Sequence, residues 1–451
     1  MKNWRLPFEG KHITVMGLGV LGRGIADVRF LHEAGAILTV TDVKTAEELA
    51  PALDQLKDHS GITYVLGGHT FLEFENADYI LKGAGVPLDS PYIQRAKEAG
   101  VAIKMDESWV AELAPKGVTF VGITGTRGKS TTTLLTHHVL KEMGASVYLG
   151  GNVPDAAMLP LLKELAEGDV VVMELSSWQL QGWYDAGISP HIGIFTNFME
   201  DHLNYYSNDM DSYFSDKAGI FSHQQQDDLL VVSPDALRAI ESHYTGDIAS
   251  MVIVAEPEDV PDDWQLQVPG EHYRQLVALS LRALLALDVP EEVIKQGVES
   301  FKSAPGRLEL LGSIQGARVY NDNHATIPAA TRIGLLAVGG SNNVVLIMGG
   351  TSKGKGIVFD DLYPVVSRTC KHIVLLDESG SRERLDDIKK TGVPVTICAN
   401  PAECVAVASQ LVTADDVLLY SPGFASFGVH FKNEYDRGRQ FVELLTKQLD
   451  R

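Results

Sequence analysis

The chain has 451 residues, of which 45% are hydrophobic and 22% charged, and its formal net charge is −21. This length predicts about three domains of ordinary size. The negative charge argues against bulk binding to nucleic acid or anionic membranes, because both are polyanions. The three cysteines, Cys370, Cys398 and Cys404, are neither a disulfide framework nor a four-cysteine zinc site. Residues 1–10 have no apolar signal core and no stretch stays apolar for about 18 residues, so we expect a cytoplasmic protein.

The N-terminal part begins with a strand-like segment at 12–16, followed by the turn Gly17-Leu18-Gly19-Val20-Leu21-Gly22 and a helix. A second strand at 37–40 ends close to Asp42. This order is typical of the first half of a dinucleotide-type fold, where glycines let the backbone approach a diphosphate at a helix N-terminus. We therefore predict a site for a nucleotide diphosphate, with Asp42 accepting from either a ribose hydroxyl or a base N–H.

Further alternating segments continue this domain. They are a strand at 77–82, a turn that starts at Gly83, a helix at 92–99, a strand at 101–104 and a helix at 107–113. The Ala-Pro-Lys-Gly sequence at 114–117 follows them and predicts a linker into a second domain.

The second domain opens with a short apolar strand at 118–121 and then the loop Gly122-Ile123-Thr124-Gly125-Thr126-Arg127-Gly128-Lys129-Ser130-Thr131. Residues with helical spacing follow, so strand, glycine loop and helix stand in the order that phosphate binding requires. Ile123 occupies the place of the usual first glycine, which makes this a shorter variant. We predict that Lys129 reaches the outer phosphates of a nucleotide and that the Ser130 hydroxyl holds Mg²⁺.

Polar side chains follow two further strands of this domain. Glu174 ends the apolar run at 169–173, and His202 comes shortly after the strand at 192–196, beside two carboxylates. Parallel sheets bind ligands at the carboxyl ends of their strands, which favours Glu174 as a Mg²⁺ ligand downstream of a Lys-Ser loop. Lys217 lies in a semi-apolar helix, and sequence alone interprets it as a lysine that snorkels to the surface.

The last third repeats the alternation of strand and helix. Residues 226–268 suggest no chemistry, two helices are predicted at 271–287 and 290–301, and residues 303–306 mark a second boundary. Strands are predicted at 318–320, 344–348, 372–376, 393–397 and 417–420, with polar or glycine-rich turns after several of them. Such turns suit a small anionic substrate. The whole pattern predicts an α/β protein with domains at 1–115, 116–304 and 305–451.

Taken together, these motifs resemble the Mur ligases of peptidoglycan synthesis over nearly the whole chain. The resemblance is most specific at 122–133, at Glu174-Leu175-Ser176-Ser177-Trp178-Gln179-Leu180, at 197–202 and at Lys217. The form of the Glu-Leu-Ser-Ser motif and the segment 421–427 are similar to those of the members that add D-glutamate to UDP-N-acetylmuramoyl-L-alanine. The resemblance implies a Rossmann-like UDP-binding domain, a central ATPase domain, a Rossmann-like C-terminal domain, and ATP-dependent amide ligation through an acyl phosphate.

The resemblance also implies roles for particular residues. ATP is expected at Gly125, Thr126, Gly128, Lys129, Ser130, Thr131, Arg307 and Asp322. The UDP substrate is expected at Gly17, Leu18, Gly19, Val20, Leu21, Asp42, Gly83, Asn152 and His202. The amino acid is expected at Lys353, Ser426 and Phe427. Catalytic roles are implied for Lys129, Glu174, His202 and Lys217, and Mg²⁺ ligation for Ser130, Glu174, His202 and a Lys217 carbamate. That carbamate needs a neutral amine, which burial or nearby cations would favour.

The sequence departs from the family pattern at several positions. Leu21 replaces a common hydroxyl residue, and His324 replaces a frequent lysine. Tyr273 and Leu276 stand where asparagines are usual, which leaves the adenine contacts there open. One extra residue after Phe427 makes the correspondence of the following positions ambiguous.

Other functions remain as alternatives at this level. A family member that adds a different amino acid fits the same motifs. A nicotinamide-dependent oxidoreductase explains the first glycine turn but leaves the loop at 122–133 without a role. A nucleotide-binding switch would hydrolyse ATP regardless of substrate, and a related amidotransferase subunit would carry a four-cysteine zinc ribbon. For partners we expect small-molecule substrates only, with no nucleic acid or membrane insertion, and a monomer.

Overall fold

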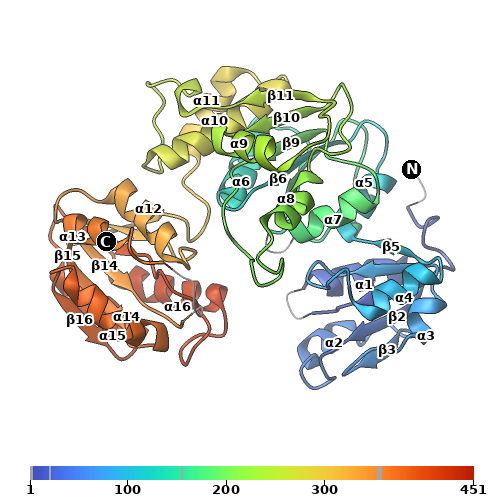
Figure 1. Cartoon of the computed structure of the whole chain (residues 1–451), viewed down its shortest axis with the longest axis horizontal. Helices are drawn as coiled ribbons and strands as arrows, with labels where there is room; N and C mark the ends of the chain where they lie inside the picture. The colour runs from blue at the N-terminus through green and yellow to red at the C-terminus, as the bar shows by residue number, and fades with distance from the viewer. Residues whose placement is uncertain (1–3, 20–21, 154–155, 353–357, 451) are drawn as a thin grey trace. The chain divides into compact units, whose positions relative to one another are not determined.

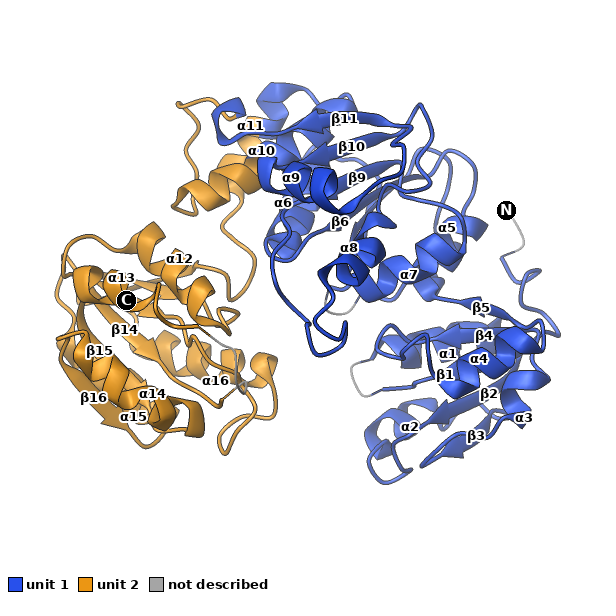
Figure 2. Ribbon diagram, viewed as in Figure 1, with its two compact units in different colours: residues 1–259, 278–294 blue, residues 260–277, 295–451 orange. Residues whose placement is uncertain are grey.

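The structure is a computed structural model that describes residues 4–19, 22–153, 156–352 and 358–450. The chain forms three β-sheets with helices between their strands, in two compact units (Figures 1 and 2). Unit 1 comprises residues 1–259 and 278–294 and holds the first two sheets, whereas unit 2 comprises residues 260–277 and 295–451 and holds the third. The predicted α/β class with three sheet domains is confirmed. The domain boundaries at 115 and 304 stay a prediction.

The first sheet has five parallel strands in the order β3-β2-β1-β4-β5. Its elements are β1 (His12–Met16), α1 (Arg23–Glu33), β2 (Ile37–Asp42), α2 (Ala50–Leu56), β3 (Thr63–Leu66), α3 (Leu72–Glu75), β4 (Tyr79–Lys82), α4 (Pro91–Glu98), β5 (Ala102–Lys104) and α5 (Asp106–Leu113). Because β1 lies between β2 and β4, the loops that follow these three strands emerge at one edge, where doubly wound sheets bind ligands.

The second sheet has six parallel strands in the order β11-β10-β9-β6-β8-β7. Its elements are β6 (Thr119–Thr124), α6 (Lys129–Glu142), β7 (Val147–Gly151), the 3-10 helix η1 (Leu159–Lys163), β8 (Val170–Glu174), α7 (Ser177–Asp185), β9 (Ile192–Phe195), α8 (Met210–Ala218), β10 (Leu229–Val232), α9 (Pro234–His243), β11 (Met251–Val254) and η2 (Pro257–Asp259). The central strands β8, β6 and β9 are almost wholly buried and apolar, as expected for strands covered on both faces. Their carboxyl ends therefore lie side by side.

The third sheet lies in unit 2 and has the order β12-β13-β17-β14-β15-β16. Helices α10 (Glu271–Ala286) and α11 (Glu291–Ser300) precede it. Its elements are β12 (Glu309–Ile314), β13 (Ala317–Asn321), α12 (Pro328–Val338), β14 (Val344–Met348), α13 (Tyr363–Thr369), β15 (Cys370–Leu376), α14 (Ser379–Lys390), β16 (Val395–Cys398), α15 (Pro401–Leu411), β17 (Val417–Tyr420) and α16 (Glu434–Thr446). Strand β12 is antiparallel to β13, through a turn at Gln315 and Gly316 in which both residues have positive φ, 52° and 81°. Sequence reasoning missed this hairpin.

One hydrophobic core runs through both sheets of unit 1. It includes Phe8 and Phe30 beside the first sheet, Trp109 in α5, and Phe120 and Trp183 in the second sheet and its helices. A separate core fills the third sheet. Among the described helices, none combines the length and the apolar character needed to cross a membrane.

A buried ionic cluster joins the helices of the first sheet to those of the second. Arg23, at the start of α1, contacts Glu107 in α5 and lies 3.5 Å from Asp106 Oδ2. Glu107 is fully buried and also accepts a hydrogen bond from Gln179 in α7. Asp27, one turn along α1 from Arg23, is buried beside them.

Burial sets the charges of this cluster. Desolvation and the neighbouring carboxylates raise the pKa of Asp106 well above its ordinary value. The pKa of Glu107 is lowered, because the charge of Arg23 and the hydrogen bonds from Asp106 and Gln179 outweigh its burial. Desolvation raises the pKa of Asp27 to about 7, although Arg23 opposes that shift.

The raised pKa of Asp27 predicts that the variant Asp27→Asn gains stability relative to wild type as pH rises. A carboxyl group that holds its proton more tightly when folded stabilises the fold at acidic pH, and this stabilisation is lost as pH rises from about 4 to about 7. The variant lacks this loss. Its free energy of unfolding should therefore rise relative to wild type across that range, by at most about 1.4 kcal/mol per pH unit. Urea unfolding at pH 5, 6, 7 and 8 measures the difference.

Asp78→Asn is the matched control. The pKa of Asp78 is lowered by hydrogen bonds from the His12 backbone and from Lys11, so its stabilisation is complete above pH 5. The difference between that variant and wild type should stay flat from pH 5 to pH 8. A flat difference for Asp27→Asn as well would contradict the assignment of charges in the cluster.

Candidate functional site

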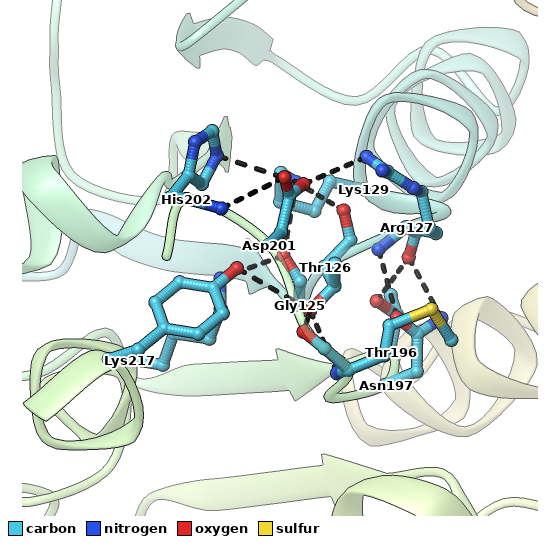
Figure 3. A network of polar contacts seen from close by, with 11 residues as sticks. Gly125, Thr126, Arg127, Lys129, Thr196, Asn197, Asp201, His202 and Lys217 are labelled. Carbon is cyan, nitrogen blue, oxygen red and sulfur yellow. Dashed lines mark hydrogen bonds and ion pairs between the residues drawn. The ribbon is translucent and has the colours of Figure 1, made fainter. Parts of the chain in front are cut away.

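The loop between β6 and α6 has the geometry of a phosphate-binding loop (Figure 3). Gly125 has φ 138° and Gly128 has φ 85°, which are conformations that other residues rarely adopt. A Cβ on Gly125 would lie 1.9 Å from Thr196 Oγ1, so no side chain fits there. Helix α6 begins at Lys129, and its first N–H groups therefore face the loop. The predicted succession of strand, glycine loop and helix is present.

Two lysine ammonium groups converge on one carbonyl of this loop. Lys129 Nζ donates to Gly125 O at 3.0 Å and to Thr126 O at 3.1 Å, and Lys217 Nζ donates to Gly125 O at 2.8 Å (Figure 3). The side chain of Lys217 is only 2% exposed, and its ammonium lies 4.7 Å from the centre of the Tyr213 ring. The interpretation of Lys217 as a snorkelling surface lysine is therefore wrong, because α8 packs this face against the loop rather than toward solvent.

Burial and a neighbouring cation change the acidity of Lys217. Desolvation, followed by repulsion from Lys129, lowers the pKa of Lys217 well below its ordinary value, and Asp201 and Asp216 oppose the shift. A neutral amine at this position is the chemical state that carboxylation by CO₂ requires.

Glu174 lies at the carboxyl end of β8, directly beside the phosphate loop. It pairs in register with Ile123 of β6, two residues before Gly125. Asn152 donates from its Nδ2 to Glu174 Oε1 at 3.2 Å and from its backbone to the Glu174 carbonyl at 2.7 Å. Within the described part of the chain, Glu174 Oε2 is buried and has no hydrogen-bond partner. A buried carboxylate oxygen without a partner beside a phosphate loop suits a hard cation such as Mg²⁺.

The loop after β9 is hydrogen-bonded to the phosphate loop (Figure 3). Asn197 accepts from the backbone N–H of Thr126 and of Arg127, both at 2.9 Å. Asp201 forms an ion pair with Arg127 at 3.1 Å and lies 3.8 Å from His202 Nε2. Sequence reasoning did not assign roles to Arg127 or Asp201, although both flank residues that it had selected.

His202 belongs to the same network. Its backbone adopts φ 52°, and its ring lies 4.8 Å from the Trp178 ring and keeps 42% of its side-chain surface exposed. Desolvation lowers the pKa of His202, and the charges of Lys217, Lys129 and Arg127 add to this, so the imidazole is neutral at pH 7. The structure thus gathers Lys129, Glu174, His202 and Lys217 around the ends of β6, β8 and β9.

A metal would need a mixed set of ligands here. Among the described residues, no three or more His, Cys, Asp or Glu side chains are grouped so that they could hold a metal ion. The candidate donors are the Glu174 carboxylate, the Ser130 hydroxyl at the start of α6, and His202. Oxygen donors of this kind, completed by phosphate oxygens, fit Mg²⁺.

A second pocket, of about 340 Å³, lies at the edge of the first sheet. Its lining includes Gly17, Leu18, Gly19 and Gly83 from the predicted turns, and the cations Arg23, Lys44 and Lys82. Asp42 is not part of this lining, and its oxygens accept from the backbone N–H groups of Gly19 at 3.1 Å and of Lys44 at 2.9 Å. Val20 and Leu21 lie outside the described residues.

Sequence reasoning did not select the cations Lys82 and Arg23 in this pocket. The side chain of Lys82 is 1% exposed, and its ammonium donates to Val86 O at 2.8 Å and to Gly83 O at 3.3 Å. Burial lowers the pKa of Lys82 to about 8. The signal that could have found both residues is their position next to glycine turns in a chain of strongly negative charge.

The remaining predicted residues lie in unit 2. Asp322 follows β13, is buried, and accepts from Ser421 Oγ at 2.8 Å and from Leu308 N at 3.3 Å. Desolvation raises the pKa of Asp322 to about 7, and the charge of Arg307 opposes the shift. Ser426 is buried and Phe427 is 64% exposed, and Lys353 lies outside the described residues.

An arginine that sequence reasoning missed holds this part of unit 2 together. Arg437 is fully buried and donates to Asn323 Oδ1 at 3.0 Å, to Asn323 O at 2.9 Å and to Phe424 O at 3.1 Å. It therefore connects the loop after β13 to the loop after β17, the two loops that carry Asp322 and Ser426.

Comparison with known proteins finds relatives over nearly the whole chain. The Mur ligase middle domain matches residues 123–265, and the family described as "Mur ligase MurD-like, N-terminal domain" matches residues 11–104. Among curated proteins, the UDP-N-acetylmuramoylalanine--D-glutamate ligase of Roseiflexus sp. (strain RS-1) is 32% identical over 98% of this chain and 99% of its own length. The protein of that name from Borreliella burgdorferi (strain ZS7) is 31% identical over 96% of this chain and 97% of its length.

Solved structures show the same fold. The crystal structure of MurF ligase from Thermotoga maritima in complex with ADP aligns with a TM-score of 0.58 at 14% identity, and covers 98% of this chain and 96% of that one. At 14% sequence identity, this structural match shows a shared fold only. The two domain matches and the two relatives above 30% identity carry the assignment: this chain belongs to the Mur ligase family, in its MurD-like branch.

Proposed function

We propose that this chain is an ATP-dependent ligase that joins D-glutamate to the alanyl carboxylate of UDP-N-acetylmuramoyl-L-alanine in peptidoglycan synthesis. The observation that carries the proposal is the convergence of Lys129 and Lys217 on the phosphate loop beside the unpartnered oxygen of Glu174. The full-length relatives named for this activity support the choice of substrates.

The reaction proceeds in two displacements. An oxygen of the alanyl carboxylate attacks the γ-phosphorus of ATP, the bond from γ-phosphorus to the β,γ-bridging oxygen breaks, and ADP leaves. The amine of D-glutamate then attacks the carbonyl carbon of the acyl phosphate, loses a proton, and inorganic phosphate leaves as the amide forms. No side-chain nucleophile is needed, so the protein contributes positioning and charge stabilisation.

The loop residues have distinct parts in these steps. The N–H groups of Gly125 to Thr131 surround the phosphates, and the Lys129 ammonium moves from its two carbonyl partners to the β- and γ-phosphate oxygens. Ser130 and Glu174 would hold a Mg²⁺ ion, which neutralises charge on the transferring phosphoryl group. Asn152 orients Glu174 through its amide. Neutral His202 would ligate a second ion or position the muramoyl-alanine substrate.

Lys217 has a proposed role as a carbamate. Its neutral amine adds to CO₂ and loses a proton, which gives an anionic carbamate whose oxygens would hold a second Mg²⁺. The buried position and the nearby ammonium of Lys129 favour the neutral amine, and the Lys129 charge also stabilises the resulting anion. The pocket at the first sheet would hold UDP over Gly17, Leu18, Gly19 and Gly83. In unit 2, Arg307 and Asp322 would contact ATP, and Ser426, Phe427 and Lys353 the amino acid.

Phosphate release from ATP should require both UDP-N-acetylmuramoyl-L-alanine and D-glutamate, because the phosphate leaves only when the amine attacks the acyl phosphate. A coupled phosphate assay that omits each substrate in turn tests this. Release that persists after either omission contradicts the ligase and indicates a nucleotide switch. Release that depends on the UDP substrate but prefers another amino acid assigns the chain to a different amide ligase. Reduction of a nicotinamide cofactor without ATP would favour the oxidoreductase.

Lys217→Ala should lower turnover by about 100-fold or more, because the second cation loses an anionic ligand. Short carboxylic acids such as formate or acetate should restore part of the activity, since they place a carboxylate where the carbamate would be. The measurement is the steady-state rate with and without added acid. Lys141→Ala, an exposed lysine on α6, is the control and should retain wild-type turnover. Unchanged turnover of Lys217→Ala would refute the carbamate role.

A further inference from the structure

Gln179 closes the N-terminal cap of α7, whose cap residue Ser176 lies two residues beyond the proposed metal ligand Glu174. The Gln179 backbone donates to Ser176 Oγ at 3.3 Å, and Ser176 donates from its N and from its Oγ to Gln179 Oε1, both at 2.8 Å. This is a reciprocal capping box, in which serine and glutamine each satisfy a backbone N–H of the other.

The side-chain amide of Gln179 is held in one orientation from outside the helix. Its Oε1 is already engaged by Ser176, so its Nε2 points away from the cap and donates to Glu107 Oε1 in α5. Glu107 is fully buried, and Arg23 contacts the same carboxylate oxygen. Because both Oε1 and Nε2 of Gln179 are hydrogen-bonded, its side-chain amide cannot flip. The carboxylate of Glu107 therefore fixes the cap.

The segment from Glu174 to Ser176 is held at the strand edge, by Asn152 and by the cap. Leu175 N donates to Ile123 O at 2.8 Å, and Thr124 Oγ1 donates to the Leu175 carbonyl at 2.8 Å. The amide N–H of Ser176 depends on Gln179. Asn152 bonds the Glu174 carboxylate directly, and the backbone that follows Glu174 is fixed by the Ser176–Gln179 bond, which Glu107 keeps in place from a helix of the first sheet.

We propose that Glu107 is a positioning residue for the ligase reaction: its carboxylate holds Gln179, Gln179 holds Ser176, and this chain of hydrogen bonds orients Glu174 for its cation. The proposal rests on the proposed function. Arg23 lines the pocket at the first sheet and also bonds Glu107, so the same carboxylate links that pocket to the loop that carries Glu174.

Glu107→Ala should lower kcat roughly 10-fold and raise the Mg²⁺ concentration for half-maximal rate by a similar factor, because outer groups that orient metal ligands have effects of this size. The KM for the UDP substrate should change little. Glu107→Gln keeps an acceptor for Gln179 Nε2 and should restore most of kcat. Arg23 keeps a carboxyl neighbour in Glu107→Ala, because Asp106 Oδ2 lies 3.5 Å from it.

Gln179→Leu supplies a second route to the same result. It removes the cap contact from the other side, so its loss of kcat should match that of Glu107→Ala. The double variant should be no slower than either single one, because the two residues act in series. This comparison also tests the proposal if Glu107→Ala fails to fold.

Glu112→Ala is the matched control, because Glu112 is a carboxylate on the same helix that pairs with Lys104 at 2.8 Å instead of with α7. It should leave kcat and the Mg²⁺ requirement unchanged. If Glu107→Ala and Gln179→Leu lower the melting temperature but leave kcat and the Mg²⁺ requirement at wild-type values, the role is merely structural and the proposal is refuted.

A binding measurement separates this proposal from the proposed function. Mg²⁺-dependent binding of a fluorescent ADP analogue is followed for wild type and for each variant, without amino acid or UDP substrate. A higher Mg²⁺ requirement for binding in Glu107→Ala supports the positioning role even if wild type fails the substrate-omission assay. If Glu107→Ala binds the analogue with the same Mg²⁺ requirement as wild type and also turns over normally as a ligase, the positioning role is overturned and the proposed function stands.

Discussion

The carbonyl of Gly125 is the acceptor around which the site is built. Two lysine side chains, those of Lys129 and Lys217, donate to this one oxygen in a protein whose formal charge is −21. Burial, followed by repulsion from Lys129, lowers the pKa of Lys217. Lys129 and the N–H groups at the start of α6 concentrate positive potential at the loop, so a protein of strongly negative net charge can still hold a nucleoside triphosphate there.

The sheet topology explains how residues so far apart in sequence reach this loop. Lys129 and His202 follow β6 and β9, and Glu174 ends β8. These three strands are adjacent in a parallel sheet, so their carboxyl ends share one edge. Lys217 arrives by another route, on a helix that covers the sheet and presents a buried face to the loop. The third sheet repeats the principle in unit 2, where the loops after β13 and β17 are held together by Arg437.

The two sheets of unit 1 are joined by polar as well as apolar contacts. The shared core passes through Trp109 in α5, and the same helix carries Glu107, which meets Arg23 from α1 and Gln179 from α7. A buried carboxylate is costly unless it is paired and hydrogen-bonded, and here it has both an arginine and an amide. Such an arrangement specifies one packing of the helices more sharply than apolar contacts alone, because misplacing any member leaves a buried charge without a partner.

Local sequence determined the central strands, the glycine turns and the candidate residues that follow them. Strands such as β6, β8 and β14 are continuous apolar runs ended by glycine or a polar residue, and this signal lies within a few neighbouring positions. The strands missed from sequence were β3, β7, β10, β11 and β12. Four of these, all except β10, are edge strands, which face solvent on one side and need no such run.

Only the tertiary structure decided which face of a helix is buried and which charges meet. Lys217 has the same sequence context whether it snorkels or packs, and its burial follows from how α8 lies on the sheet. The pairing of Asp201 with Arg127, and of Glu107 with Arg23, joins residues 74 and 84 positions apart. No local pattern encodes such pairs, because their energies arise from desolvation that exists only once the sheets and helices have packed.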